Sequence, residues 1–239
     1  MISITRIKEL AQKYQTTELN VKREYFQHLF LSYFYQQAST DSIFFKGGTA
    51  LRFLFNSPRF SEDLDFSATI KKISVIEQTL IQTLVQIEKE GIIPAILEAK
   101  TTSGGYLSNI SFQGYEQPVE IQLQISLRES SSRGELLTIV NDFVPAYTVV
   151  GLTQIKLISE KIKALLSRKK PRDFYDLYFI LRANLLTSTQ KSILSKVLQT
   201  LHTVNINFES ELKLFLPKSH CPIIKNFKAT LEQEIRRFM

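Results

Sequence analysis

The stretch Phe44-Phe45-Lys46-Gly47-Gly48-Thr49-Ala50-Leu51 joins an apolar run to a helix-like segment, residues 50–55, through two glycines. This pattern is typical of a strand that passes directly into a helix. The first amides of such a helix favour an anion, and glycines allow phosphate oxygens to approach the backbone closely. The stretch therefore predicts a strand, a turn and a helix with a phosphate site at Gly47 and Gly48.

A second stretch, Arg59-Phe60-Ser61-Glu62-Asp63-Leu64-Asp65-Phe66, places two aspartates two residues apart. On a strand, Asp63 and Asp65 share one face while Leu64 and Phe66 point into the core. Adjacent carboxylates repel each other, and a divalent cation between them removes the repulsion. Hard oxygen ligands suit Mg²⁺ or Mn²⁺. A solvated loop is the alternative for an isolated Asp-x-Asp, but the order of the two stretches favours a catalytic site.

Composition limits the class of protein. The 239 residues are 44% hydrophobic and 22% charged, which is enough for one large domain or two small ones. The formal charge of +7 is compatible with a polyanionic partner, although many basic proteins bind none. No apolar run approaches a membrane span and residues 1–10 contain no secretory core, so we expect a cytoplasmic protein. The single cysteine, Cys221, excludes an internal disulfide.

Periodicity predicts strands and helices, hence an α+β fold, followed by a helical part. We place the boundary between residues 1–150 and 151–239. Helical spacing covers 21–37, 75–90, 153–168, 188–201, 208–216 and 223–238, a further helix begins near residue 171, and extended candidates cover 95–99, 106–112 and 119–127.

The last extended candidate alternates cleanly between apolar and polar residues. Val119, Ile121, Leu123 and Ile125 take one face, and Glu120 lies on the other. If this strand lies beside the strand of Asp63 and Asp65, Glu120 is a candidate third carboxylate for a metal. The alternative is a glutamate that faces solvent.

The glycine turn followed by Asp-x-Asp resembles the nucleotidyltransferase fold of the DNA polymerase beta type, which implies a mixed sheet flanked by helices. The strings 46–51 and 59–66 are more particularly similar to the AbiEii family of nucleotidyltransferase toxins. A second block follows the sheet and also matches that family: Glu160-Lys161-Ile162-Lys163-Ala164, then Arg172-Asp173-Phe174-Tyr175-Asp176-Leu177.

The resemblance implies an enzyme that moves a nucleoside monophosphate from an NTP to an acceptor and releases pyrophosphate. It also implies a toxin with a cognate antitoxin, and some relatives modify the 3′ end of tRNA. The implied catalytic set is Asp63, Lys161 and Asp176, with Ser61 at the phosphates, Lys161 neutralising the triphosphate and Asp176 orienting the nucleotide or the nucleophile. The complete set of expected site residues is Gly47, Gly48, Thr49, Ser61 and Lys161 for the nucleotide, and Asp63, Asp65 and Glu120 for Mg²⁺ or Mn²⁺.

Other interpretations stay open at this stage. The same core can modify a protein hydroxyl, a glycosyltransferase also uses Asp-x-Asp, and the chain could be a non-catalytic basic RNA-binding partner protein. Arg23 and His28 match the Arg-x4-His pattern of HEPN ribonucleases, although a histidine beside an apolar helical stripe is more often structural. Lys161 could be a solvated lysine, and Arg172 could form an ion pair with Asp176 along a helix.

Overall fold

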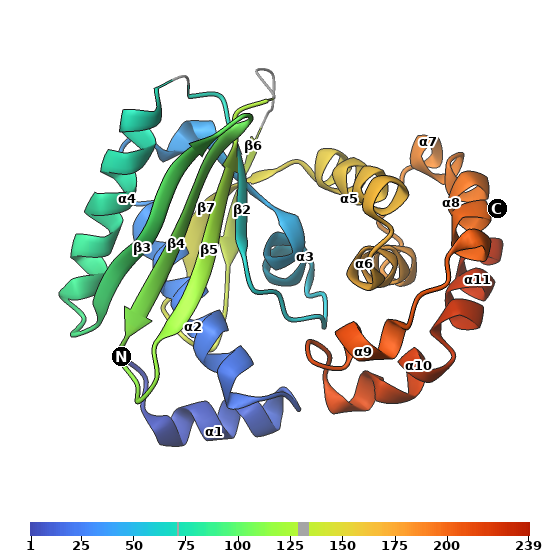
Figure 1. Cartoon of the computed structure of the whole chain (residues 1–239), viewed down its shortest axis with the longest axis horizontal. Helices are drawn as coiled ribbons and strands as arrows, with labels where there is room; N and C mark the ends of the chain where they lie inside the picture. The colour runs from blue at the N-terminus through green and yellow to red at the C-terminus, as the bar shows by residue number, and fades with distance from the viewer. Residues whose placement is uncertain (71, 129–133) are drawn as a thin grey trace. The chain divides into compact units, whose positions relative to one another are not determined.

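A computed structural model describes residues 1–70, 72–128 and 134–239 (Figure 1). The chain divides into two compact units. The sheet unit contains residues 1–56 and 60–152, and the helical unit contains residues 57–59 and 153–239. The boundary expected after residue 150 falls inside strand β7 (Tyr147–Leu152). The expected division also placed residues 57–59 with the sheet, whereas they belong to the helical unit.

The described residues of the sheet unit form a seven-stranded mixed sheet, which confirms the α+β class. Strand β2 pairs antiparallel with β1 and parallel with β5, and β1 pairs parallel with β7. Strands β6 and β7 were not predicted from the sequence. The order is β3-β4-β5-β2-β1-β7-β6, with bounds β1 Ile43–Lys46, β2 Leu64–Ala68, β3 Ile93–Thr102, β4 Gly105–Gln113, β5 Val119–Ser126, β6 Gly134–Ile139 and β7 Tyr147–Leu152.

Helices α2 (Glu18–Phe34), α3 (Gly47–Phe55) and α4 (Ile73–Glu88) pack against the sheet (Figure 1). Helix α2 contacts α4, and it also contacts α3, where His28 of α2 stacks on Phe53. Helix α1 (Ile4–Lys13) packs against α2. Phe34 of α2 contacts Phe66 of β2 with ring centroids 5.3 Å apart, and Leu64 is also buried. The core therefore receives Leu64 and Phe66, as the alternation predicts.

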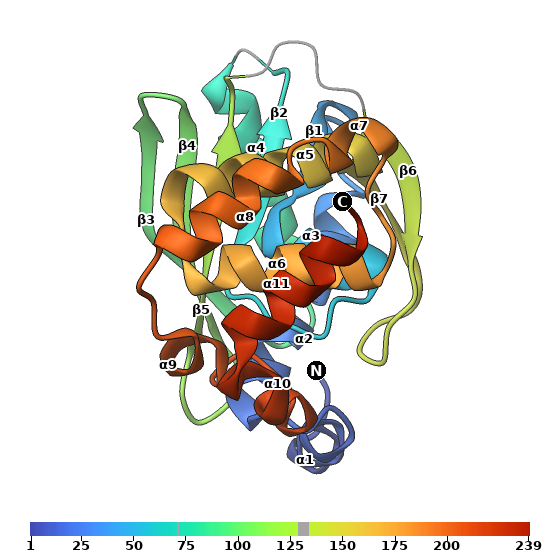
Figure 2. The ribbon, with the colours of Figure 1, turned by 90° about the vertical axis from the view of Figure 1, so that its right-hand side faces the viewer.

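The helical unit begins with two helices that pack on each other, α5 (Gln154–Arg168) and α6 (Pro171–Arg182). Helix α5 starts at the N-cap Thr153 and ends at Lys169 in the left-handed region, while Pro171 opens α6. Helix α11 packs against α6 (Figure 2). The remaining elements are α7 Ser188–Lys191, α8 Leu194–Thr203, α9 Phe208–Leu212, the short 3-10 helix η2 Lys218–His220, α10 Cys221–Lys225 and α11 Phe227–Arg237.

No helix within the described ranges has the length and apolar character needed to traverse a bilayer.

Candidate active site

Gly47 and Asp65 lie against each other where β1 passes into α3. The antiparallel register of β1 and β2 places Lys46 opposite Asp65. A Cβ atom added to Gly47 would come within 2.1 Å of Asp65 Oδ2, and the φ of Gly47 is +86°. Both the positive φ and the close approach require glycine at this position. The structure therefore brings the glycine turn and one of the paired carboxylates together.

Thr49 connects the start of α3 to the start of β2. Its side-chain hydroxyl donates a hydrogen bond to the backbone carbonyl of Asp63. Helix α3 begins with Gly47, Gly48 and Thr49, and the side chain of its N-cap residue, Lys46, makes no capping hydrogen bond. A helix N-terminus carries partial positive charge and favours an anion. Thr49 therefore has two roles: its hydroxyl positions the backbone of Asp63, and its own backbone lies in the first turn of α3.

Asp63 and Asp65 stand on either side of the buried Leu64, and both carboxylate residues are partly exposed. This exposure pattern fits a pair of acids that reaches the surface of the sheet unit next to the glycine turn. Two hard oxygen donors separated by one residue, close to a glycine without a side chain, fit a divalent cation such as Mg²⁺.

Helix α2 fixes the backbone that leads into Asp63. The side-chain amide of Gln27 donates to the carbonyls of Ser61 and Glu62, both at 3.0 Å, and only 1% of Gln27 is exposed. Arg23 of the same helix pairs with Glu62 at 3.2 Å. Sequence reasoning missed Gln27, although a polar side chain on the buried side of a core helix is a signal that a partner must exist.

His28 is a core residue. It is 3% exposed, its Nδ1 lies 2.8 Å from the hydroxyl of Tyr147, and its ring stacks on Phe53 with centroids 3.8 Å apart. Burial and the nearby positive charge of Arg52 lower the pKa of His28 to about 3. Because the imidazole is packed in the core, it cannot reach an RNA phosphate, so the match to the HEPN ribonuclease pattern is coincidental.

Glu120 does not lie beside the paired aspartates. The parallel register of β2 and β5 places Gln124 opposite Asp65, and Glu120 is an exposed residue four positions earlier in β5. Across the ranges that the structure describes, no three His, Cys, Asp or Glu side chains are close enough together to hold a metal ion. The carboxylate that lies next to Gly47 is that of Asp65, and Asp63 is held near the start of α3 through its backbone carbonyl.

A second charged cluster lies inside the helical unit and consists of Arg59, Lys161 and Asp176. Asp176 accepts hydrogen bonds from Arg59 Nε at 2.8 Å and Nη2 at 3.1 Å, and from Lys161 Nζ at 2.7 Å. Asp176 is 1% exposed. Burial opposes its ionisation, but the charges of Arg59 and Lys161 outweigh burial and lower the pKa of Asp176 to about 2. The three groups together carry one net positive charge.

This cluster excludes the two simpler interpretations of its residues. The side chain of Lys161 is only 11% exposed, so Lys161 is not a solvated lysine. Arg172 lies 3.9 Å from Glu211, and the partners of Asp176 are Arg59 and Lys161 rather than Arg172. Arg59 was missed as a site residue, although it opens the stretch 59–66 that carries the aspartates.

Comparisons with known proteins give the family of this chain. Residues 29–235 match the family model described as the nucleotidyl transferase AbiEii toxin of type IV toxin–antitoxin systems. Among solved structures, the chain is similar to MenT4, a nucleotidyltransferase toxin from Mycobacterium tuberculosis H37Rv. The TM-score is 0.73 at 14% sequence identity, with 100% of this chain and 90% of MenT4 covered.

The chain is also similar to JHP933 from Helicobacter pylori, with a TM-score of 0.57, 19% identity, and 93% of this chain and 95% of JHP933 covered. No curated protein matches the sequence. At these identities the solved structures establish the fold, whereas the family model covers most of the chain. The chain therefore belongs to the AbiEii family, the nucleotidyltransferase toxins of type IV toxin–antitoxin systems.

Proposed function

We propose that this nucleotidyltransferase toxin transfers a nucleoside monophosphate from an NTP to the 3′ end of a tRNA and releases pyrophosphate. The observation that carries the proposal is the contact of Asp65 with Gly47 at the N-terminus of α3. This contact puts a carboxylate that can hold a cation next to backbone amides that can bind phosphate oxygens.

Asp63 and Asp65 would hold Mg²⁺ or Mn²⁺, and such an ion polarises a phosphoryl group and neutralises its charge. The backbone amides of Gly47 and Gly48 would receive phosphate oxygens, because neither residue has a side chain in the way. Ser61 would add a hydroxyl contact to the triphosphate, and Gln27 holds the backbone at Ser61.

The helical unit would supply positive charge and orientation. Lys161 has three N–H donors, and Asp176 accepts from its ammonium group, so donors remain for a phosphate oxygen where pyrophosphate charge develops. Asp176, with a pKa of about 2, is a carboxylate at neutral pH and a weak base. We therefore assign Asp176 to orienting Lys161 and a hydroxyl of the nucleotide or the acceptor, rather than to removing a proton.

The formal charge of +7 supports a polyanionic acceptor over a protein hydroxyl. RNA and NTPs coexist in the cytoplasm, where we place the reaction, and a cognate antitoxin would counter it. We assign Glu120 at most a minor role in metal binding, because the register of β2 and β5 places Gln124, and not Glu120, next to Asp65.

The test supplies total cellular RNA and total protein with each of four radiolabelled NTPs and Mg²⁺. We expect label in the tRNA band, loss of that label in Asp63→Asn and Asp65→Asn, and loss of toxicity in the same variants. Label in a protein band instead would identify a protein hydroxyl as the acceptor. Transfer from a UDP-sugar without nucleotide transfer would replace the proposal with a glycosyltransferase.

The matched control is Glu120→Gln, which removes an exposed carboxylate of the same sheet. It should keep most of the activity, since Glu120 lies away from Asp65 in the register. Loss of activity equal to that of Asp63→Asn would restore Glu120 as a metal ligand.

A further inference from the structure

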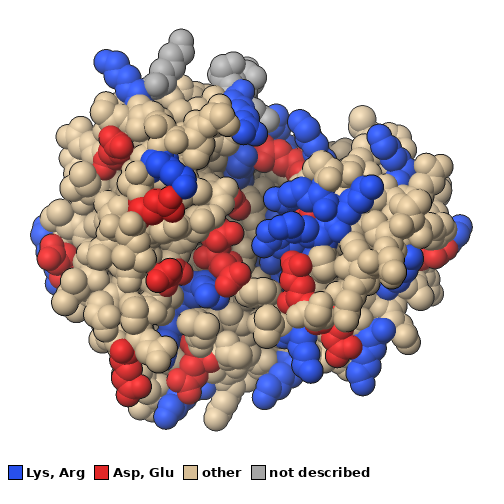
Figure 3. All heavy atoms as spheres, in the orientation of Figure 1, with Lys and Arg blue, Asp and Glu red and all other residues tan. Residues whose placement is uncertain are grey.

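The positive charge of this protein is concentrated in one unit. Residues 57–59 and 153–239 contain 17 Lys and Arg against 7 Asp and Glu, a formal charge of +10. The remaining residues contain 13 against 16, a formal charge of −3, and the two values add to the +7 of the chain. Figure 3 shows basic side chains gathered on the visible face of the helical unit. A polyanion is therefore attracted by the helical unit rather than by the sheet unit.

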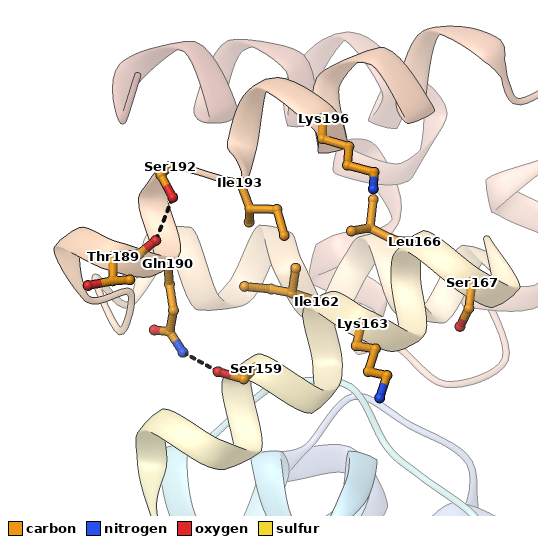
Figure 4. A pocket seen from close by; sticks show the side chains of 10 residues that line it. All are labelled: Ser159, Ile162, Lys163, Leu166, Ser167, Thr189, Gln190, Ser192, Ile193 and Lys196. Atoms are coloured by element: carbon orange, nitrogen blue, oxygen red, sulfur yellow. Dashed lines mark hydrogen bonds between the residues drawn. The ribbon is translucent and has the colours of Figure 1, made fainter.

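A groove of about 730 Å³ lies within this unit, between α5 on one side and α7 and the start of α8 on the other (Figure 4). Ile162, Leu166 and Ile193 form its apolar floor. One end is closed by Gln190, whose side-chain amide donates to the hydroxyl of Ser159 at 2.9 Å. The groove is thus a defined concave feature held by a contact between its two sides.

Two lysines border the groove, Lys163 from α5 and Lys196 from α8. Figure 4 shows the ammonium group of Lys196 pointing toward Leu166. Within the described parts of the chain, neither lysine forms an ion pair, and none of the ten lining residues is acidic. The hydroxyl groups of Ser159 and Ser167 on the same lining donate to backbone carbonyls of α5, so the lysines are the charged donors of the groove. Ammonium groups on a lining without acidic residues are suited to phosphate oxygens.

We propose that this groove is a binding site for the sugar–phosphate backbone of the acceptor RNA, separate from the residues that perform the transfer. The proposal rests on the proposed function, because it assigns the acceptor of that reaction to RNA. The lining contains no aromatic residue on which a base could stack. The groove therefore contacts phosphate and ribose and does not select a base sequence.

An acidic helix of a partner protein is the competing occupant. Such a helix would place apolar side chains in the groove, but the apolar residues of the lining are limited to Ile162, Leu166 and Ile193, and Ile162 is only 4% exposed. The formal charge of +10 is spread over the whole helical unit. A long polyanion can contact charges spread in this way, whereas a single short helix would use only a few of them. These observations favour RNA.

The experiment measures binding of a fluorescent hairpin RNA with a single-stranded 3′ tail to the full-length protein, by anisotropy, without NTP. In Lys163→Gln/Lys196→Gln we expect an affinity about tenfold lower near 150 mM salt, and a salt slope smaller by about 1 for each lysine. The matched control, Lys213→Gln/Lys218→Gln, removes two exposed lysines of the same unit outside the groove. It should change the affinity by less than about threefold.

Equal losses in both double variants, no loss in either, or an absence of RNA binding by the wild-type protein would overturn the proposal. Tighter binding of an acidic Glu- and Leu-containing peptide, abolished by the groove variant, would overturn it in favour of a protein partner. The assay contains no NTP, so the two proposals fail separately. RNA binding through the groove without labelling of RNA would refute the proposed reaction and leave the groove assignment intact.

Discussion

Asp176 and Arg59 are 117 residues apart in the chain, yet the carboxylate of Asp176 lies in the fork of the Arg59 guanidinium, with oxygen–nitrogen distances of 2.8 and 3.1 Å. Both residues are buried. The guanidinium is planar and matches a carboxylate with two parallel hydrogen bonds, which an ammonium group cannot do. This pair ties residues 57–59 to α6 within the helical unit. Arg59 precedes Asp63 by four residues in the sequence.

Arg59→Ala should destabilise the helical unit strongly. Removing one partner leaves the carboxylate of Asp176 buried with Lys161 alone, and breaking a buried pair in this way costs about 3–5 kcal/mol. Arg59→Lys should cost less, because it keeps the charge and loses the fork. Urea unfolding of the three proteins measures both effects.

The control for this prediction is Arg172→Ala, because Arg172 is partly exposed and lies 3.9 Å from Glu211. An exposed pair of this kind contributes about 0–1 kcal/mol. If Arg59→Ala and Arg172→Ala cost the same, the Arg59–Asp176 pair has no special structural role.

Gly47→Ala should abolish nucleotide transfer. The new Cβ would meet Asp65 Oδ2 at 2.1 Å, so either the carboxylate or the start of α3 must move. Gly91→Ala is a matched control, since Gly91 also has a positive φ, +77°, but nothing lies within 4 Å of the position of its Cβ. Both variants bear a backbone strain of about 1–2 kcal/mol, and only Gly47→Ala displaces a site residue. Transfer rates and thermal unfolding of both variants separate the two effects, and full activity of Gly47→Ala would remove Asp65 from the site.

The strand and the helix within residues 43–55 could be predicted because they depend on local signals, although the helix begins at Gly47, directly after the strand, rather than at residue 50 after a turn. Gly47 and Gly48 interrupt an apolar run, and the alternation at 63–66 fixes which side chains enter the core. Partners that are distant in the sequence could not be predicted in this way. Nothing near Arg59 indicates that Asp176 accepts its hydrogen bonds, and the hydrophobic pattern does not reveal that β7 pairs in parallel with β1.

Glu120 illustrates a second limit. The alternation in 119–126 correctly assigns Glu120 and Gln124 to the polar face, because side chains on a strand repeat with a period of two. Period alone does not distinguish registers that differ by two or four residues. The pairing of β2 with β5 decides this, and it places Gln124 next to Asp65. The sequence therefore predicts which face of a strand a side chain occupies, but it does not predict which residue lies beside it on the next strand.

Lys161→Ala should raise the KM for NTP and lower kcat/KM by about 10- to 100-fold, which corresponds to loss of one charge-assisted hydrogen bond. The fold should persist, because Arg59 still pairs with Asp176. Lys163→Ala, two residues away and on the border of the groove, should leave the KM for NTP unchanged and raise the KM for RNA. Steady-state kinetics with each substrate varied in turn distinguishes the two lysines. Unchanged NTP kinetics in Lys161→Ala would confine Lys161 to a structural role.

Stability should fall as the pH is lowered from 7 to 5, and His28 should account for part of the fall. Burial and Arg52 lower the pKa of His28 from 6.5 to about 3 in the folded protein. Between these values the unfolded chain binds a proton that the folded protein does not, so the free energy of unfolding decreases by about 1.4 kcal/mol per pH unit. The loss begins near pH 6.5 and amounts to about 2 kcal/mol at pH 5.

His28→Gln tests this assignment, since glutamine can still hydrogen-bond to Tyr147 but has no titrating group in this range. The variant will be less stable at pH 7, because the ring stacked on Phe53 is lost, but its unfolding free energy should depend less on pH between 7 and 5. Urea unfolding at half-unit pH intervals measures the two slopes, with His202→Gln, an exposed histidine, as the control. Equal slopes for wild type and His28→Gln would mean that His28 takes up its proton in the folded protein, which would reopen the question of a chemical role for it.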